Sequence, residues 1–180
     1  MRWDAPHIEV ENRAQWRAWL AANHATCTGA WLVAFQKNSG RGRIGYDEAV
    51  EEALCFGWID GVSGKVDDLR AKPWFCPRRP KSGWSKVNKD RVQRLIDQGL
   101  MTSAGLAVIE AAKQSGARSL LDDVEAMVIP ADFAMALDAN PVAPATWLLL
   151  TRYNNGEATF PSWSFPIPTF AVTSPMARSA

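Results

Sequence analysis

The stretch WIDGVSGKVDDLRAKPWFC (residues 58–76) decides the fold, because it predicts two paired strands. "WIDGVSG" and "LRAKPWFC" both combine aromatic and branched apolar residues, and the polar residues 65–68 between them indicate a turn. Pro73 lies within the second strand and has no backbone N–H to donate to a neighbouring strand. We therefore expect the second strand to lie at an edge of the sheet.

Upstream of this pair, the sequence predicts two further strands, at residues 8–10 and 30–37. A helix is expected between them, beginning after the N-cap residue Asn12 and ending near Asn23. A second helix is expected from Tyr46 to a C-terminal cap at Gly57.

Downstream, the pattern becomes mainly helical. Helices are predicted from about Ser85 to Gln98, after the N-cap residue Thr102, and at residues 131–139. The apolar positions expected to face inward are Val87, Val92, Leu95, Ile96, Leu106, Ile109 and Ala112, the last three against the preceding helix. The sequence thus predicts an α+β fold: a small, mainly antiparallel sheet packed with helices, then a helical C-terminal half and an irregular tail.

The overall composition is that of an ordinary globular protein. The chain has 180 residues, of which 47% are hydrophobic and 22% charged, a length that favours one domain with a real core. No signal peptide and no apolar run long enough to span a membrane is recognisable, so we do not expect an integral membrane protein. The three cysteines lack Cys-x-x-Cys spacing, which argues against a disulfide framework and favours a cytoplasmic location.

The net charge of +1 conceals a strongly basic segment. Between Arg70 and Arg94 there are nine Lys and Arg residues against one acid, Asp90, so the remainder of the chain is acidic. A one-signed segment in a nearly neutral protein is able to bind a polyanion locally.

The centre of this segment, FCPRRPKSGWSKVNKDR (residues 75–91), is the strongest candidate for a binding site. Pro77 and Pro80 stiffen the backbone around the two arginines, and the helix that follows offers free N–H groups to an anion. Tryptophans within and before the segment could stack on a base or ring. The residues expected to bind the ligand are Arg78, Arg79, Lys81, Trp84, Ser85, Lys86, Lys89, Trp58 and Asp60.

Several interpretations of this segment stay open at this point. The first is a non-enzymatic binding module for an anionic ligand, which would be a nucleic acid, a phosphorylated small molecule or an anionic lipid surface. The second is an enzyme with a pocket built around Trp58, Asp60, Arg79 and Trp84, and the third is a surface for a protein partner. A plain solvated basic face, with its tryptophans in the core, accounts for the same residues.

Asp60 is unusual because it lies in a predicted strand directly after Trp58 and Ile59. One interpretation is a salt bridge to Arg70, Arg78 or Arg79. The other is that the carboxylate orients one of these arginines toward a bound ligand.

Three other motifs carry little chemistry. GRGRIG (residues 40–45) has the spacing of a dinucleotide-binding loop, but Asp47 and Glu48 at the following helix N-terminus would repel a pyrophosphate. Cys55 lies among apolar residues and is interpreted as a buried hydrophobe rather than a nucleophile. His24 and Cys27 are too few ligands for a zinc site. We expect no metal and no cofactor.

Four segments together resemble the YdeI/OmpD-associated family, also labelled bacteriocin-protection proteins. They are NRAQWRAWLAANHAT, YDEAVEEALCFGWIDG, PRRPKSGWSKVNKDRVQRLIDQGLMTSAGLAVIEAAK and ALDANP. The resemblance covers about residues 8–143 and implies a small soluble bacterial protein with a role in resistance to bacteriocins or envelope stress. It implies no catalytic residue and no cofactor.

Residues 144–180 depart from that family pattern, since they are rich in proline and aromatic residues and nearly free of charge. We therefore expect one domain at residues 1–143 and a poorly ordered, aberrant tail at 144–180. An out-of-frame translation of the helix that such proteins carry there is a hypothesis that resequencing the coding region tests.

Overall fold

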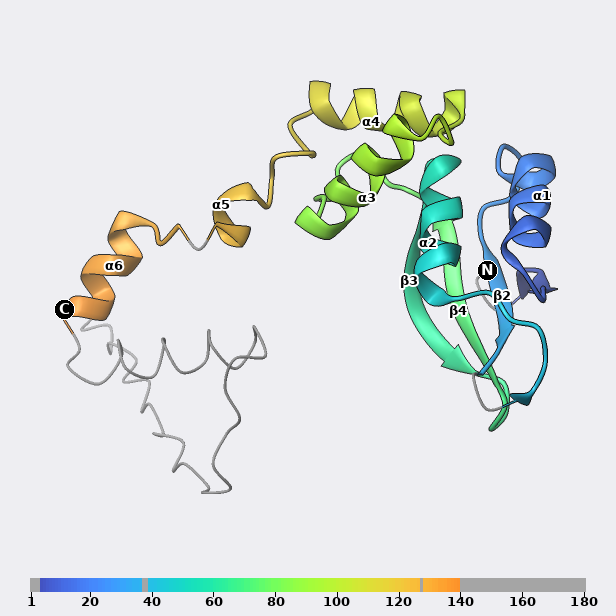
Figure 1. The fold of residues 1–180 in the computed structure, drawn as a ribbon. Helices are drawn as coiled ribbons and strands as arrows, with labels where there is room; N and C mark the ends of the chain where they lie inside the picture. Colours follow the sequence, from blue (N-terminus) through green and yellow to red (C-terminus); the bar gives the residue numbers. More distant parts are fainter. Residues whose placement is uncertain (1–3, 37–38, 127, 140–180) are drawn as a thin grey trace, which may run out of the picture. The chain divides into compact units, whose positions relative to one another are not determined.

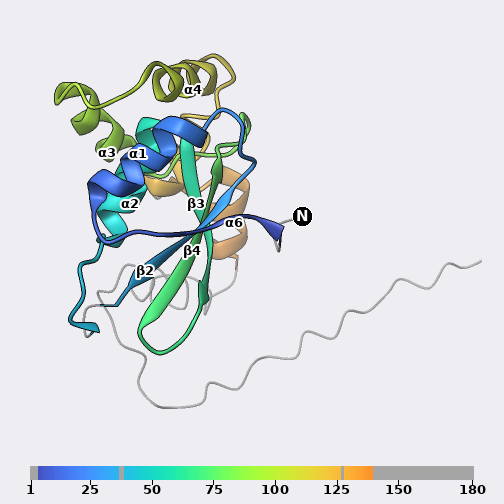
Figure 2. The ribbon, with the colours of Figure 1, turned by 90° about the vertical axis from the view of Figure 1, so that its right-hand side faces the viewer.

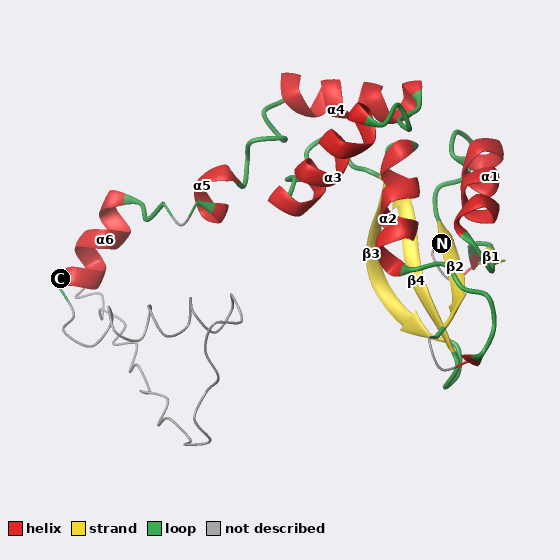
Figure 3. Cartoon of the chain, in the orientation of Figure 1, coloured by secondary structure: helices red, strands yellow, loops and turns green. Residues whose placement is uncertain are grey.

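The computed structural model describes residues 4–36, 39–126 and 128–139 (Figure 1). The chain runs β1 (His7–Glu9), α1 (Arg13–Asn23), β2 (Ala30–Phe35), α2 (Tyr46–Cys55), β3 (Trp58–Lys65), β4 (Arg70–Pro77), α3 (Lys86–Asp97), α4 (Ser103–Gln114), α5 (Asp122–Glu125) and α6 (Ala131–Asp138). Strands thus dominate the first half and helices the second (Figure 3). The predicted α+β class is confirmed.

One sheet of four strands has the order β1-β2-β4-β3. The β1–β2 pair is parallel, whereas β2–β4 and β3–β4 are antiparallel. The strands predicted from residues 58–76 are therefore neighbours, as expected.

The expectation that β4 lies at an edge is wrong, because β4 is hydrogen-bonded to both β2 and β3. The sheet accommodates Pro73 beside an irregularity in the pairing of β4 with β3. Toward β2, the paired positions skip from Trp31–Trp74 to Ala34–Ala71, and toward β3 a shift in register separates Asp60 from Ser63. Pro73 is the register partner of Ser63 directly after this shift, and toward β2 it lies between two recorded pairs, so its missing N–H leaves the pairing on either side intact.

Helices α1 and α2 cover one face of the sheet (Figures 1 and 2). Trp16 and Leu20 of α1 are fully buried, and the Trp16 indole N–H donates to the carbonyl oxygen of Ala49 in α2 at 3.1 Å. Asn12 caps α1 by accepting the Gln15 N–H, and the helix ends at Asn23 as predicted. Gly57 follows α2 with a φ of 75°, a left-handed conformation that glycine adopts at little cost.

A buried carboxylate, which the sequence did not single out, joins α1 to α2. Glu52 is 2% exposed and pairs with Arg13 at 2.5 Å and Arg17 at 2.6 Å. Arg17 also donates to the carbonyl oxygen of Leu100 at 2.9 Å. Two guanidinium partners offset the cost of burying this carboxylate, a cost that an unpaired carboxylate would carry in full.

Helices α3 and α4 lie at the end of the sheet where β4 finishes (Figure 1). Val92, Leu95, Ile109 and Ala112 are buried as predicted. Val87, Ile96 and Leu106 are exposed, so the expectation that they face inward is wrong.

These three residues are exposed because the buried stripe on each helix is narrower than the sequence periodicity predicted. Helix α4 contacts the end of α2, where Gly105 lies against the carbonyl of Cys55 and the Thr102 hydroxyl donates to the same oxygen at 2.6 Å. Only the faces of α3 and α4 nearest to this contact are covered.

The chain divides into two compact units, residues 1–128 and 129–180. In the second unit the structure describes residues 129–139, which contain α6, so the expected tail at 144–180 and the 143/144 domain boundary lie outside the described residues. Within the part of the chain that is described, no helix is long and apolar enough to cross a membrane.

Candidate functional site

The basic residues 78–85 form an ordered loop without helix or strand between β4 and α3. The Arg78 N–H donates to the carbonyl oxygen of Gly57 at 3.0 Å, and the Ser82 N–H donates to that of Arg79 at 3.0 Å. At the far end, the Ser85 hydroxyl accepts the N–H of Asn88 and caps α3. The loop is thus fixed by a backbone contact at Arg78 and by a side-chain cap at Ser85, which places its side chains reproducibly.

Arg78 does not reach into solvent but turns inward. The residue is only 8% exposed, and its guanidinium carbon lies 4.0 Å from the centre of the Trp84 ring. One terminal nitrogen donates to the carbonyl oxygen of Gly83, whereas the buried Nε has no hydrogen-bond partner among the described residues. Burial lowers the pKa of Arg78, and the nearby Asp60 charge offsets only part of this effect.

A second arginine, Arg118, meets the same tryptophan from the segment between α4 and α5. Its guanidinium carbon lies 5.5 Å from the centre of the Trp84 ring, so the guanidinium groups of Arg78 and Arg118 both contact this ring. Its Nη1 is buried and, in the described structure, also lacks a hydrogen-bond partner. Arg118 was not predicted from the sequence, because it lies 34 residues beyond Trp84, outside the basic run and outside any motif.

The aromatic side chains of this region belong to the core. Trp58, Trp74, Phe75 and Trp84 are all less than 9% exposed, and the Trp58 indole N–H donates to the carbonyl oxygen of His24 at 3.2 Å. The expectation that tryptophans near the loop stack on a bound base is therefore wrong. Their apolar area is used for packing, and the ring of Trp84 is covered by Arg78 and Arg118 rather than open to a ligand base.

Five of the basic residues between Arg70 and Arg94 are paired with acids, three of them with acids that are distant in the sequence. Arg94 pairs with Glu51 at 2.9 Å, Arg91 pairs with Asp47, and Lys89 pairs with Asp122. Lys86 pairs with Asp90 at 3.0 Å, and Arg70 pairs with Asp67 at 2.7 Å. The segment is therefore not an open basic face.

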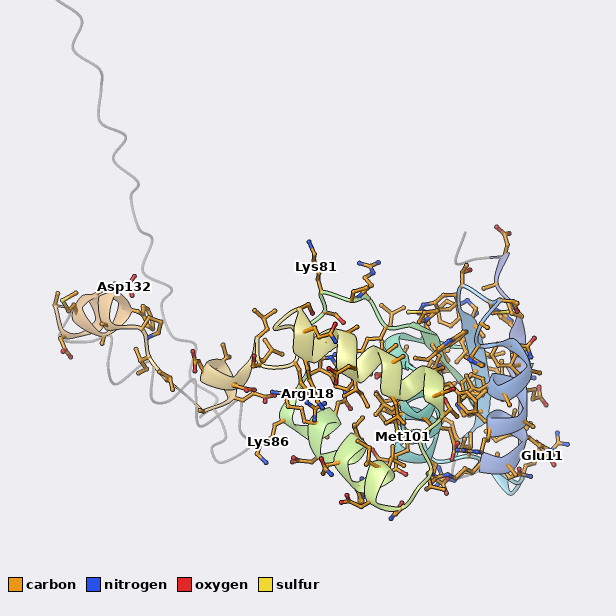
Figure 4. All side chains as sticks on the ribbon, turned by 90° about the horizontal axis from the view of Figure 1, so that it is seen from above. Glu11, Lys81, Lys86, Met101, Arg118 and Asp132 are labelled. Atoms are coloured by element: carbon orange, nitrogen blue, oxygen red, sulfur yellow. The ribbon has the colours of Figure 1, made fainter. Side chains whose placement is uncertain are left out.

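Arg79 and Lys81 are the exceptions at the tip of the loop. Both are exposed, and neither takes part in an ion pair within the described ranges. Figure 4 shows that Lys81 points away from Lys86 and Arg118, so the predicted site residues do not converge on a single surface. Arg79 and Lys81 are exposed residues of the loop, whereas Lys86 and Lys89 of α3 form ion pairs with Asp90 and Asp122.

Asp60 is bound by a tyrosine rather than by an arginine. Its Oδ2 accepts the hydroxyl of Tyr46, and no ion pair joins Asp60 to Arg70, Arg78 or Arg79 in the described structure. Burial and this hydrogen bond raise the pKa of Tyr46 to about 12. The expected salt bridge is wrong because the start of α2, not the basic loop, lies over this part of β3.

The pocket expected around Trp58, Asp60, Arg79 and Trp84 does not form, because both tryptophans are buried while Arg79 is exposed. A cavity of about 310 Å³ lies elsewhere, between the sheet and the start of α2, and is lined mainly by apolar residues that include Leu32, Ala34, Ile44 and Ala71. None of the predicted site residues lines it.

The other chemical candidates remain structural. Cys55 is fully buried, and burial raises the pKa of its thiol, as expected of a packed hydrophobe rather than a nucleophile. His24 Nδ1 lies 2.9 Å from the carbonyl oxygen of Leu20. Among the described residues, no group of three or more His, Cys, Asp or Glu side chains is placed to hold a metal ion.

Residues 8–108, more than half of the 180-residue chain, match the family described as a domain of unknown function, DUF8412. The chain belongs to this family. Its assignment to the YdeI/OmpD-associated family is corrected by this match, and the bacteriocin-protection role rested on that resemblance alone. No curated protein and no solved structure matches the chain.

The DUF8412 match begins in β1 and ends within α4. It therefore contains the loop, Trp84 and the N-terminus of α3, but not Arg118 or the acidic helix α5. The second arginine on Trp84, and the acids Asp122 and Glu125 that contact the start of α3, come from the sequence that follows the matched domain.

Proposed function

We propose that this DUF8412 protein is a non-enzymatic binding module for a compact anionic ligand, a phosphorylated small molecule. The ligand binds beside Trp84, between the guanidinium groups of Arg78 and Arg118 and the N-terminus of α3. Arg79 and Lys81 contribute charge from the exposed tip of the loop. The observation that carries the proposal is the pair of buried guanidinium nitrogens, Arg78 Nε and Arg118 Nη1, that have no acceptor in the described structure.

A phosphate group suits this arrangement because guanidinium groups and helix N-termini both offer N–H donors that match phosphate oxygens. Two arginines on one buried tryptophan, neither of them in an ion pair within the described residues, carry an electrostatic cost, which an anion offsets. Burial lowers the pKa of Arg78, and a bound anion would raise it again.

The same geometry argues against an extended polyanion. A nucleic acid needs a continuous positive track and exposed rings for stacking, but here Trp58, Trp74 and Trp84 are buried. Asp47, Glu51 and Asp122 neutralise the basic residues along α3 that would extend such a track, and a flat anionic membrane would meet the same acids. We place the protein in the cytoplasm, a location that its free cysteines favour.

The test is a titration followed by ¹H–¹⁵N NMR of the full chain with four probes. These are inorganic phosphate, a sugar monophosphate, a single-stranded oligonucleotide and vesicles containing an anionic phospholipid, each at low and high salt. The proposal expects the two phosphate probes to shift the indole N–H of Trp84 and the backbone amides of residues 78–86.

Two variants and a matched control sharpen this test. Arg118→Gln is expected to weaken phosphate binding at least about tenfold, since a charge-assisted hydrogen bond is lost. Arg79→Ala/Lys81→Ala is expected to weaken it about twofold to fivefold, as exposed charges do.

Lys113→Ala, which removes an exposed lysine from α4, is expected to change nothing. If only the oligonucleotide or only the vesicles bind, the ligand of this site is that polyanion and not a phosphorylated small molecule. Unchanged spectra with all four probes would overturn the proposal.

A further inference from the structure

The N-terminus of α3 already carries a carboxylate from the chain itself. The backbone N–H of Lys86, the first residue of α3, donates to Glu125 Oε1 at 2.5 Å. Helix N-termini attract anions because their first N–H groups are unpaired and the helix dipole is positive there. Glu125 thus occupies a donor that a bound phosphate would use.

Two further contacts hold the same piece of chain in place. Asp122 pairs with Lys89, one turn into α3 from Lys86. Leu121 lies against Gly83, so closely that a Cβ on residue 83 would stand 2.9 Å from Leu121 Cγ. Residues 121–125, here called the acidic segment, therefore touch the loop and the first two turns of α3 at three points.

The acidic segment also lies close to the two arginines that each have one buried nitrogen without a hydrogen-bond partner in the described structure. Arg118 precedes it by three residues and lies over Trp84, and Arg78 donates to the carbonyl oxygen of Gly83, the residue on which Leu121 rests. Arg78 is more than nine-tenths buried, and its unpaired Nε lies in this same loop. The carboxylates of the acidic segment and a phosphate ligand would thus meet the same group of donors.

We propose that the acidic segment is an internal competitor that regulates anion binding at this site, an inference that rests on the proposed function. The ligand binds by displacing Glu125 from the Lys86 N–H and weakening the pair between Asp122 and Lys89. The segment is suited to release, because α5 has only four residues and all of them are exposed. Such a short helix is not stable by itself and is held only by its contacts.

The test compares the wild type with the variant Asp122→Asn/Glu125→Gln and with the matched control Asp123→Asn. Asp123 lies in the same helix and is exposed, but its side chain makes no hydrogen bond or ion pair within the described residues, so its removal changes charge without breaking a contact. Affinity for inorganic phosphate is measured by NMR titration on the full-length proteins. Hydrogen exchange of residues 119–126 is measured with and without saturating phosphate.

The double variant is expected to bind phosphate about tenfold more tightly than the wild type, the effect of removing a competing charge-assisted hydrogen bond. Asp123→Asn should gain about twofold at most, the general effect of one exposed charge. Phosphate should speed exchange in residues 119–126 of the wild type, because the segment is released.

Equal affinities of the wild type and the double variant, with phosphate bound by both, would overturn the competitor and leave the proposed function standing. An equal gain in Asp123→Asn and in the double variant would do the same, since only net charge would matter. No binding by either protein would overturn both.

Discussion

Replacing Arg118 with methionine should stabilise the protein in the absence of ligand and destabilise it, relative to the wild type, when phosphate is present. Methionine keeps an unbranched stem against Trp84 and removes the guanidinium group. The reversal follows from the position of Arg118, whose Nη1 is buried without a partner in the described structure while its guanidinium carbon stays 5.5 Å from the ring centre.

The magnitude is a difference between two contributions. A buried donor without an acceptor costs about 1–3 kcal/mol, and a partly exposed cation over an aromatic ring returns about 0.5–1 kcal/mol. Arg118→Met should therefore raise the free energy of unfolding by about 0.5–2 kcal/mol without phosphate. Phosphate at a hundred times its dissociation constant would stabilise the wild type by about 2.7 kcal/mol and the variant far less, which reverses the order.

The assay is urea denaturation followed by tryptophan fluorescence, in a phosphate-free buffer and in a series of phosphate concentrations. Arg78→Met serves as the comparison. It removes a buried charge, which stabilises the protein, but it also removes the closer ring contact at 4.0 Å and the hydrogen bond to Gly83. These effects should offset each other and leave the free energy of unfolding nearly unchanged. A loss of more than about 1 kcal/mol for Arg118→Met without phosphate would refute the reasoning, since it would mean that the buried nitrogen is stabilising in the free protein. A stability difference that does not depend on phosphate would refute the link to binding.

Other parts of the molecule give three further predictions. Gly105→Ala should lower the free energy of unfolding in urea by about 2 kcal/mol or more, because its Cβ would stand 2.3 Å from a carbonyl oxygen of α2; the usual gain of alanine in a helix would contradict this. Glu52→Gln should cost about 3 kcal/mol with little dependence on salt, since the carboxylate is buried between two arginines; a cost below about 1 kcal/mol would show that the pair is not needed. In Tyr153→Phe, which leaves Tyr46 as the one tyrosine, phenolate absorbance should show a titration midpoint near pH 12. Adding Asp60→Asn to this variant should lower the midpoint toward pH 10.0. Because folding raises this pKa, the contribution of Tyr46 to stability is complete below pH 10.0 and is lost as the pH rises to about 12; a midpoint near 10 without the second substitution would contradict the hydrogen bond.

Local rules predicted the elements well. The cap at Asn12, the end of α1 at Asn23 and the turn at Gly57 depend on a few neighbouring residues, and each was found where the sequence indicated. The candidate loop was found in the same way, since Pro77 and Pro80 exclude a helix between β4 and α3.

What the sequence by itself determined is therefore the set of strands, the turns and every helix except the four-residue α5, because these follow from contacts within a few residues. Only the tertiary structure decided that β4 is central, that Trp84 is buried and that Asp60 meets Tyr46, since each depends on which distant segments pack together. The same holds for the site. A run of basic residues is visible in the sequence, but the net positive charge around each residue depends on which acids the fold places beside it. The fold brings carboxylates to Lys89, Arg91 and Arg94, and it brings a second arginine, Arg118, to the ring that Arg78 covers.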